Sequence, residues 1–361
     1  MKRNGKIEFL RFLFGFMVLA FHVQKYLPGE IKIGDTIDFA FFPHGAMGVE
    51  FFFLTSGFLM ATNVFKRINE PAKISIGEST TIFLKNKIVS LLPLHLICFT
   101  LLFATQFYIN DWGIKRALLK LIENIPSLLF IQMSGFNGSV INHIEWYISV
   151  MLLSMLIIYP ILKKNYMLFV RVIAPIISIF AIGFLYKNAK MLGGVSIWYS
   201  VVFRGFVRGF AEICLGTVCF EISRNIQKQK FNNIQKILFS FVELAVWCSA
   251  FGLIMFTVPK TYQFYILLFI AAGITLTFSD VSFGKKIFNN KFFYFLGKIS
   301  LPLYLCQLTT IQLSNHLISH LPMTDRMIYT IVATFILALI LQGIDTLIKK
   351  LLSMKKQQIK T

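Results

Sequence analysis

The first long apolar run of the chain, residues 7–24, carries an arginine and a histidine eleven positions apart, Arg11 and His22. In an α-helix this spacing is three turns plus about 20°, so both side chains project from one stripe, about 16 Å apart. Arginine is always charged and its planar guanidinium suits phosphate or carbonyl oxygens, whereas histidine accepts a proton near neutral pH. The pair therefore predicts anion or carbonyl binding at Arg11 and general-base catalysis at His22.

A simpler interpretation of the same run stays open. Glu8 and Arg11 have the i, i+3 spacing of an ion pair on one helix, and His22 has the place of an interfacial histidine that only forms hydrogen bonds. An arginine near the centre of a membrane-spanning helix nevertheless costs about 2.5–3.5 kcal/mol. Such residues are therefore functional candidates by default.

The next apolar run, residues 44–58, contains a carboxylate, Glu50, that needs a partner inside an apolar environment. Its residues Gly48, Phe52 and Ser56 are four positions apart and form one stripe, on which small side chains allow close contact between helices. Packing accounts for the glycine but not for Glu50, which we take as a candidate catalytic residue.

An acidic and aromatic segment begins a later apolar run, where Glu145, Trp146 and Tyr147 follow His143. Aromatic rings at the mouth of a membrane helix either stack on the faces of a sugar or form an interfacial belt. Glu145 fits neither interpretation and is a further catalytic candidate.

Three charged residues, Arg204, Arg208 and Glu212, are spaced at i, i+4 and i+8 and share one side of a predicted helix. They face protein or a water-filled cavity, since charges avoid lipid. They either form an internal ion-pair ladder or supply an arginine that stabilises a developing oxyanion.

The elements that position these residues are membrane-length helices. The chain is 56% hydrophobic and 14% charged, with a mean hydropathy of +0.70, which no ordinary soluble domain of 361 residues matches. We predict an all-α fold, a polytopic integral membrane bundle of about ten transmembrane helices. The predicted spans are residues 7–27, 45–64, 84–107, 144–162, 166–186, 198–221, 236–256, 261–279, 292–318 and 327–350.

The net charge of +20 does not indicate a nucleic-acid partner, because the basic residues do not gather on one exposed face with aromatic or polar readers. Most of the 36 lysines and arginines fall instead in every second loop, in the set that includes the N-terminus and the C-terminal tail. The positive-inside rule then predicts a multi-pass protein of the cell membrane with both termini in the cytoplasm.

The domain organisation follows from the same pattern: residues 1–352 form one transmembrane domain, and residues 353–361 form a short basic tail. In the longest outer loop, residues 108–143, the segment 114–132 predicts an interfacial helix. The five cysteines all lie in apolar segments, which favours packing over disulfides or a metal site.

Four segments, in order along the chain, resemble the membrane acyltransferase 3 family. The segment LRFLFGFMVLAFH from Leu10 has the family's Arg, ten residues and His, and GVEFFFLTSGF from Gly48 has its Gly-x-Asp/Glu-x-Phe-Phe-x-x-Ser-Gly signature. The segments RGFAEICLGTVCFE from Arg208 and LGKISLPLYLCQ from Leu296 are similar to two later family segments.

Two positions depart from the family pattern. Ser90 stands where the family usually has the arginine of an Arg-x-x-Pro motif, and Gln307 stands where a histidine usually follows Tyr-Leu. These departures concern donor binding more than the class of reaction.

The resemblance implies transfer of an acyl group, often acetyl, from a cytoplasmic acyl-CoA to a hydroxyl of a cell-envelope glycan or small molecule. His22 would deprotonate the acceptor hydroxyl or take the acyl group itself. The residues we assign to catalysis are Arg11, His22, Glu50 and Glu145; those assigned to the acyl donor are Arg11, Ser56, Lys85 and Lys87; and those assigned to the acceptor are Trp146, Tyr147, Arg204 and Arg208.

Two rival functions remain from the sequence: a carrier for a lipid-linked saccharide or small polar solute, and a family member that senses or assembles without catalysing. No metal is expected, because His316 and His320 have the spacing of a zinc pair but no third ligand nearby. Three other intramembrane polar residues, His95, Glu243 and Asp345, are predicted to pair with neighbours.

Overall fold

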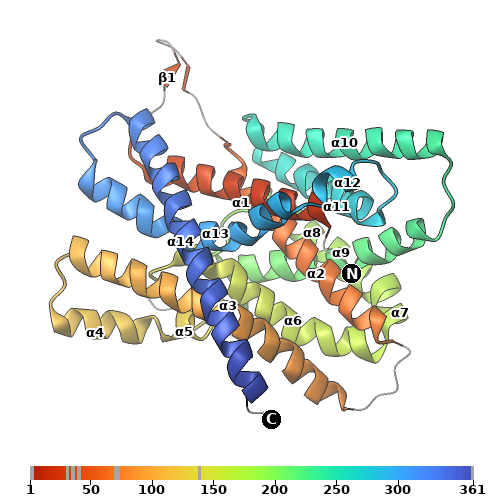
Figure 1. Ribbon diagram of the computed structural model, residues 1–361, viewed down its shortest axis with the longest axis horizontal. Coiled ribbons are helices and arrows are strands. Elements are labelled where there is room, and N and C mark those ends of the chain that lie inside the picture. The colour runs from red at the N-terminus through yellow and green to blue at the C-terminus, as the bar shows by residue number, and fades with distance from the viewer. Residues whose placement is uncertain are drawn as a thin grey trace.

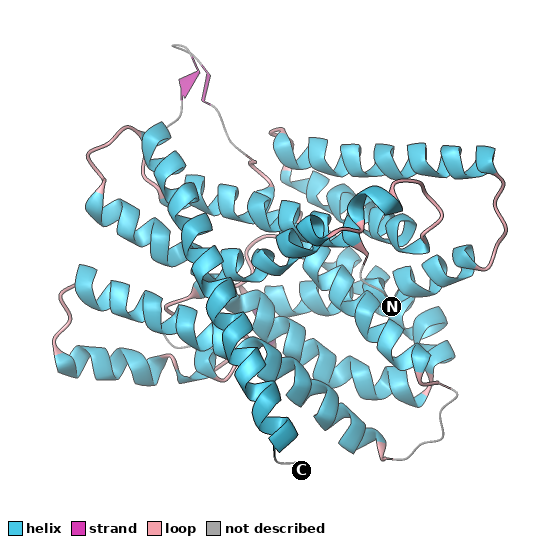
Figure 2. Ribbon diagram, in the orientation of Figure 1, coloured by secondary structure: helices cyan, strands magenta, loops and turns pink. Residues whose placement is uncertain are grey.

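The protein is a bundle of helices, as a computed structural model describes for residues 4–29, 32–33, 37–38, 42–68, 74–136 and 140–358 (Figures 1 and 2). The prediction of an all-α polytopic membrane bundle is confirmed. The only strands in the described ranges are two short antiparallel pairs, β1 (Lys32–Ile33) with β2 (Ile37–Asp38) and β3 (Trp198–Tyr199) with β4 (Val202–Phe203).

Most of the helices are strongly apolar. In chain order they are α1 (Gly5–Tyr26), η1 (Gly45–Met47), α2 (Gly48–Lys66), α3 (Ile76–Ile109), α4 (Ile114–Glu123), α5 (Ile125–Leu128), η2 (His143–Glu145), α6 (Trp146–Lys164), α7 (Tyr166–Leu168), the π-helical η3 (Phe169–Ile173), α8 (Ala174–Ala189), α9 (Arg204–Gln227), α10 (Asn233–Met255), η4 (Lys260–Tyr262), α11 (Gln263–Ser279), α12 (Lys285–Phe288), α13 (Lys291–Leu317) and α14 (Met323–Gln358).

Each of the ten predicted spans contains a long helix, with α7, η3 and α8 together filling one of them. The span predicted at 198–221 is wrong at its start, where β3 pairs with β4 and α9 begins only at Arg204. Eight of these helical segments are long and apolar enough to cross a membrane. The other two, α9 and α13, are 24 and 27 residues long but carry more polar side chains. Most of α9 is buried against other helices, so its charged residues meet protein instead of lipid.

Helices from opposite halves of the sequence pack together at the centre, α1 along α13 and α2 along α9. Glycines permit the second contact: a Cβ atom added at Gly57 would lie 2.0 Å from the carbonyl oxygen of Ile213, and one added at Gly216 would lie 2.1 Å from that of Leu54. The backbones of α2 and α9 therefore approach to a distance that any side chain at these positions would prevent.

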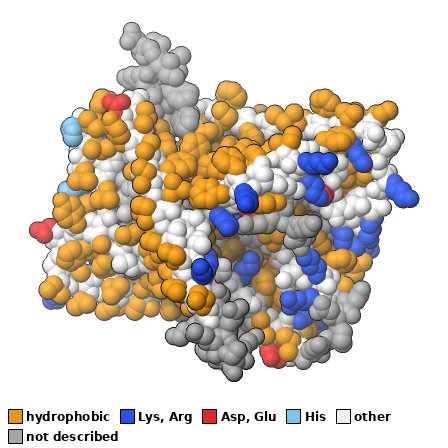
Figure 3. All heavy atoms as spheres, in the orientation of Figure 1, with side chains coloured by type: hydrophobic (Ala, Val, Ile, Leu, Met, Phe, Trp, Pro, Cys, Tyr) orange, Lys and Arg blue, Asp and Glu red, His pale blue; other side chains and the backbone are white. Residues whose placement is uncertain are grey.

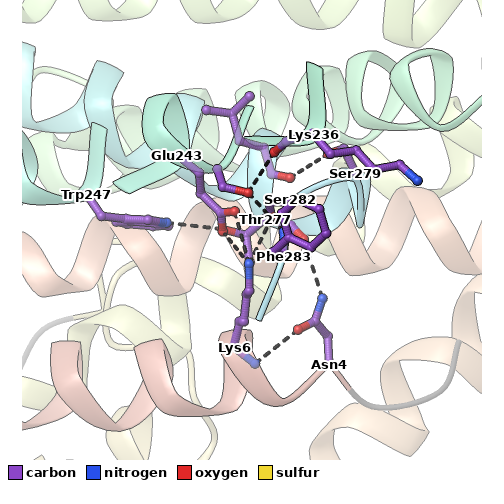
Figure 4. Close-up of polar contacts among 11 residues, drawn as sticks. Asn4, Lys6, Lys236, Glu243, Trp247, Thr277, Ser279, Ser282 and Phe283 are labelled. Atoms are coloured by element: carbon purple, nitrogen blue, oxygen red, sulfur yellow. Dashed lines mark hydrogen bonds and ion pairs between the residues drawn. The ribbon is translucent and has the colours of Figure 1, made fainter. Parts of the chain in front are cut away.

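A buried polar cluster holds the first turn of α1 against α10 and α11 (Figure 4). Lys6 Nζ donates to Glu243 Oε2 at 3.1 Å and to Ser282 Oγ at 2.8 Å. Thr277 Oγ1 donates to Glu243 Oε1 at 2.7 Å and accepts from Trp247 Nε1 at 3.1 Å. The predicted pairing of Glu243 is confirmed, and the cluster sets the depth of α1, which carries both candidate residues of the first apolar run.

Lysine and arginine side chains gather over one half of the face drawn in Figure 3, the half in which Figure 1 marks the N-terminus. Four of the basic residues counted in the sequence, Lys2, Arg3, Lys73 and Lys360, lie outside the described residues. Helix α14 continues through Gln358, into the segment predicted as a tail.

The helix predicted over residues 114–132 is shorter in the structure: α4 ends at Glu123 and the short α5 follows it. No residue of α4 is buried, and its apolar side chains, among them Ile114, Leu118 and Ile122, are exposed. This is the pattern of a helix that rests its apolar face on the membrane interface.

Candidate active site

A cavity of about 710 Å³ lies between α1, α2, α3, α6, α13 and α14, and we call it the donor cavity, after the role we propose for it below. It begins near Asn4 and Lys349, close to both ends of the described chain, and runs inward to Tyr147 and Tyr304. Along α13 the lining changes from Lys298 near the start of the helix to Leu301, Pro302 and Tyr304 further in, whereas α1 contributes only residues of its first turns, up to Arg11.

Four cations line the donor cavity: Arg11, Lys87, Lys298 and Lys349. Arg11 lies 3.7 Å from the Glu8 carboxylate, as the i, i+3 spacing predicts, and Lys349 donates to Asp345 at 2.6 Å. Lys87 and Lys298 make no ion pair within the described residues. The cavity therefore retains positive charge that suits a phosphorylated ligand.

Lys85 and Lys87, which the sequence assigned together, have different surroundings. Lys87 is partly buried, lines the donor cavity and lies 5.9 Å from the Phe83 ring centre. Lys85 is exposed and is not among the lining residues. Ser90, where the family usually has arginine, also lines the cavity.

The base candidate, His22, contacts Gln307 on α13, with 3.1 Å between Nδ1 and Oε1. The amide orientation of Gln307 is set by its Nε2, which donates to the Tyr304 carbonyl at 2.8 Å. Its Oε1 can only accept, so Nδ1 of His22 must carry the proton. The lone pair of neutral His22 is then on Nε2, the nitrogen that a general base would use.

The donor cavity ends one helical turn short of this histidine. Tyr304 is its deepest lining residue on α13, whereas Gln307 lies three residues, about 4.5 Å, further along the helix. His22 itself is not a lining residue. Arg11 lies in the cavity and His22 just past its inner end, so the two candidates on the α1 stripe occupy two depths, as their spacing predicts.

Tyr26 packs against His22 on the side away from the donor cavity and links it to His143. The Tyr26 ring stacks on the His22 ring with 5.7 Å between their centres. The Tyr26 hydroxyl lies 2.8 Å from Nε2 of His143. The sequence singled out His143 only as part of its segment and did not identify Tyr26.

Ser56 and Tyr147 meet at the inner end of the donor cavity, with 3.3 Å between their hydroxyl oxygens. Tyr147 is buried and its ring lies 4.6 Å from the Phe53 ring centre. Trp146 is partly buried and points toward α9, where the Arg208 guanidinium lies 5.4 Å from its ring centre. The two adjacent aromatic residues therefore face different surroundings.

Glu50 on α2 forms a buried ion pair with Arg208 on α9. Arg208 also donates from Nε to Glu212 at 3.2 Å and from Nη1 to the Leu192 carbonyl at 3.2 Å. The predicted ladder thus exists between Arg208 and Glu212. Arg204 turns away from it and donates to the Tyr199 hydroxyl at 2.8 Å.

Glu145 pairs with His95 of α3, with 3.1 Å between Oε2 and Nδ1 and both side chains fully buried. The predicted pairing of His95 is confirmed, and the partner is one of the candidate catalytic residues. Nε2 of His95 has no hydrogen-bond partner within the described part of the chain.

Several site residues had no signal of their own in the sequence. Gln307 was noted only because it departs from the family pattern, yet it determines the tautomer of His22. Lys298 and Tyr304 lie in a recognised segment but were not singled out. In the described ranges, no group of three or more His, Cys, Asp or Glu side chains has the arrangement of a metal site.

The comparison with protein families gives one match, to the model described as an acyltransferase domain, over residues 4–342. No match was found among curated proteins or solved structures. The matched range contains α1 to α13, most of α14, the donor cavity apart from its last lining residues on α14, and the His22–Gln307 pair. The chain therefore belongs to the acyltransferase 3 family, and it is a membrane acyltransferase.

Proposed function

We propose that this protein transfers an acyl group, most simply acetyl, from cytoplasmic acyl-CoA to a hydroxyl of a cell-envelope saccharide. The observation that carries the proposal is the donor cavity, lined by cations at its outer end and followed by a histidine with a defined tautomer. The enzyme would lie in the cell membrane with both termini in the cytoplasm.

The donor would enter by its acyl end, with its charged end remaining near the cytoplasmic mouth. Lys87, Lys298 and Arg11 would contact the phosphates and the polar parts of the CoA chain, because all three line the cavity. The inner lining, which includes Phe52, Leu94 and other apolar residues, suits the acyl end. Ser56 and Tyr147 would then lie beside the thioester as hydroxyl donors.

The reaction needs His22 to accept one proton and then return it. Nε2 of His22 would take the proton of the acceptor hydroxyl while that oxygen attacks the thioester carbonyl. The C–S bond then breaks, the acyl group becomes an oxygen ester, and the CoA thiolate leaves and is protonated from His22. Gln307 supports this by accepting from Nδ1, which keeps the lone pair on Nε2.

The remaining candidates have supporting roles in the proposal. Arg208 is held by Glu50 and Glu212 and lies over the Trp146 ring, so we assign it to positioning Trp146 at the start of α6. Glu145, paired with His95, would orient the start of α6.

The test is acetyl transfer by purified protein in lipid, with radiolabelled acetyl-CoA and envelope glycans of the host. We expect wild-type protein to consume the thioester and label the glycan, and His22→Ala to lose more than about 100-fold of this activity, as general-base catalysis contributes about 10²–10⁴-fold. Both proteins should insert and purify alike, because alanine is well tolerated in a helix.

Retained turnover in His22→Ala would remove His22 as the essential base. Passage of a labelled saccharide across the bilayer without thioester consumption would favour a carrier instead.

A further inference from the structure

A second pocket, of about 490 Å³, lies at the other end of the bundle from the donor cavity, and we call it the distal pocket. It is formed by the end of α3, Trp112, one side of α4, residues 140–141 and the last turns of α13. Figure 1 shows α4 far from the N-terminus along the long axis of the molecule. The two cavities therefore lie at opposite ends of α3 and α13, which line both of them.

The distal pocket is rich in side chains that form hydrogen bonds. Four carboxamides line it, Gln106, Asn110, Gln312 and Asn315, together with the indole of Trp112. Trp112 is only 6% exposed, and its Nε1 has no hydrogen-bond partner among the described residues. Oε1 of Gln312 is buried and unpartnered within the same ranges. Buried polar groups without partners are uncommon, so these two atoms indicate a polar ligand.

The charge of the distal pocket is positive. Arg116 and Lys120, one turn apart on α4, line it together with His316, and none of its lining residues is Asp or Glu. Lys120 contacts Glu123 at 2.8 Å outside the pocket, whereas Arg116 is exposed and makes no ion pair within the described chain. An anionic group would therefore find a cation there that is not already neutralised.

The distal pocket adjoins the surroundings of the candidate base. Asn315, one of its lining residues, donates from Nδ2 to the Tyr26 carbonyl at 2.9 Å. Tyr26 stacks on His22, one turn of α1 away, which is about 6 Å along the helix. A molecule in the distal pocket would thus approach His22 from the side opposite to the donor.

We infer that the distal pocket binds the acceptor and that the acceptor is an acidic saccharide. That the bound sugar is the acceptor rests on the proposed function, whereas its acidic character is inferred from the pocket alone. The unpartnered Trp112 Nε1 and Gln312 Oε1 match hydroxyl groups, and Arg116 matches a carboxylate or phosphate on the sugar. A lipid headgroup would account for the cation but not for the two buried polar atoms without partners, Trp112 Nε1 and Gln312 Oε1.

The test uses two disaccharides that differ by a single carboxyl group, cellobiose and cellobiouronic acid. Their binding to the full-length protein, in discs of uncharged phosphatidylcholine, is measured by equilibrium dialysis without acyl-CoA. We expect about tenfold tighter binding of the acid, the size of one hydrogen bond to a charged group. Arg116→Gln should abolish this preference, whereas Lys115→Gln, an adjacent exposed lysine outside the lining, should keep it.

Equal binding of the two sugars by wild-type protein, or binding of neither, would overturn the inference. The inference would also fail if the protein bound vesicles that contain phosphatidylglycerol in an Arg116-dependent way while it bound the two sugars equally. That result would assign Arg116 to lipid binding. A preference for the acid, with no thioester consumption in the separate acetyl-transfer assay, would support the pocket and refute the proposed transfer from acetyl-CoA. Acetyl transfer with equal binding of the two sugars would support the proposed transfer and refute the inference about the distal pocket.

Discussion

The side-chain amide of Gln307 determines which ring nitrogen of His22 can accept a proton. Gln307 accepts from Nδ1 because its own Nε2 is committed to the Tyr304 carbonyl. The base therefore has one defined tautomer, and the residue responsible acts through His22 instead of touching the substrates.

Replacing this amide tests its positioning role. Gln307→Met keeps the length of the side chain but cannot accept a hydrogen bond from Nδ1. The loss of one hydrogen bond of about 1.4 kcal/mol should lower kcat about tenfold. KM for acetyl-CoA should stay the same. Gln307→Glu, which can accept, should retain more activity than Gln307→Met. If the two variants lose activity equally, Gln307 serves packing and not the tautomer.

At Arg11 the question is whether charge or shape matters. Arg11→Lys keeps the charge but loses the planar fork, so kcat/KM for acetyl-CoA should fall about tenfold at unchanged thermal stability. Steady-state kinetics and thermal unfolding on the same preparation measure both. A fully active lysine variant would show that a point charge is sufficient at this site.

Among the helices, the contact of α2 with α9 positions Glu50 for Arg208. Gly57→Ala would place a methyl group against the backbone of Ile213, where only a shift of a whole helix makes room. We expect a loss of about 1–3 kcal/mol of stability and a reduced activity. Gly183→Ala on α8 is the matched control, because a Cβ atom there meets nothing within 4 Å. Equal thermal unfolding of the two variants would argue against a tight α2–α9 contact.

For the whole molecule, the proposal requires the donor to enter from one end only. Lys87→Gln should raise KM for acetyl-CoA more than Lys85→Gln, because only Lys87 lines the donor cavity. The comparison removes the same charge at neighbouring positions, so a general electrostatic effect of the basic face would change both variants alike. Equal changes in KM would place the phosphates outside the cavity.

The sequence by itself determined where the helices form and that Arg11 and His22 lie at two different depths along α1. Apolar length and turn spacing are local properties, and in lipid a segment must satisfy its own backbone hydrogen bonds, so the helices of all ten spans could be predicted. The resemblance of four segments also indicated the family that the comparison confirmed.

Only the tertiary structure decided which residues meet. Gln307 is 285 residues from His22, Arg208 is 158 residues from Glu50, and His95 pairs with Glu145 across two helices. These contacts depend on the rotation and depth of each helix, which are set by close glycine contacts and by clusters such as that of Lys6 and Glu243. The same packing leaves Lys87 in the cavity and Lys85 outside it, because side chains two positions apart on a helix face different neighbours.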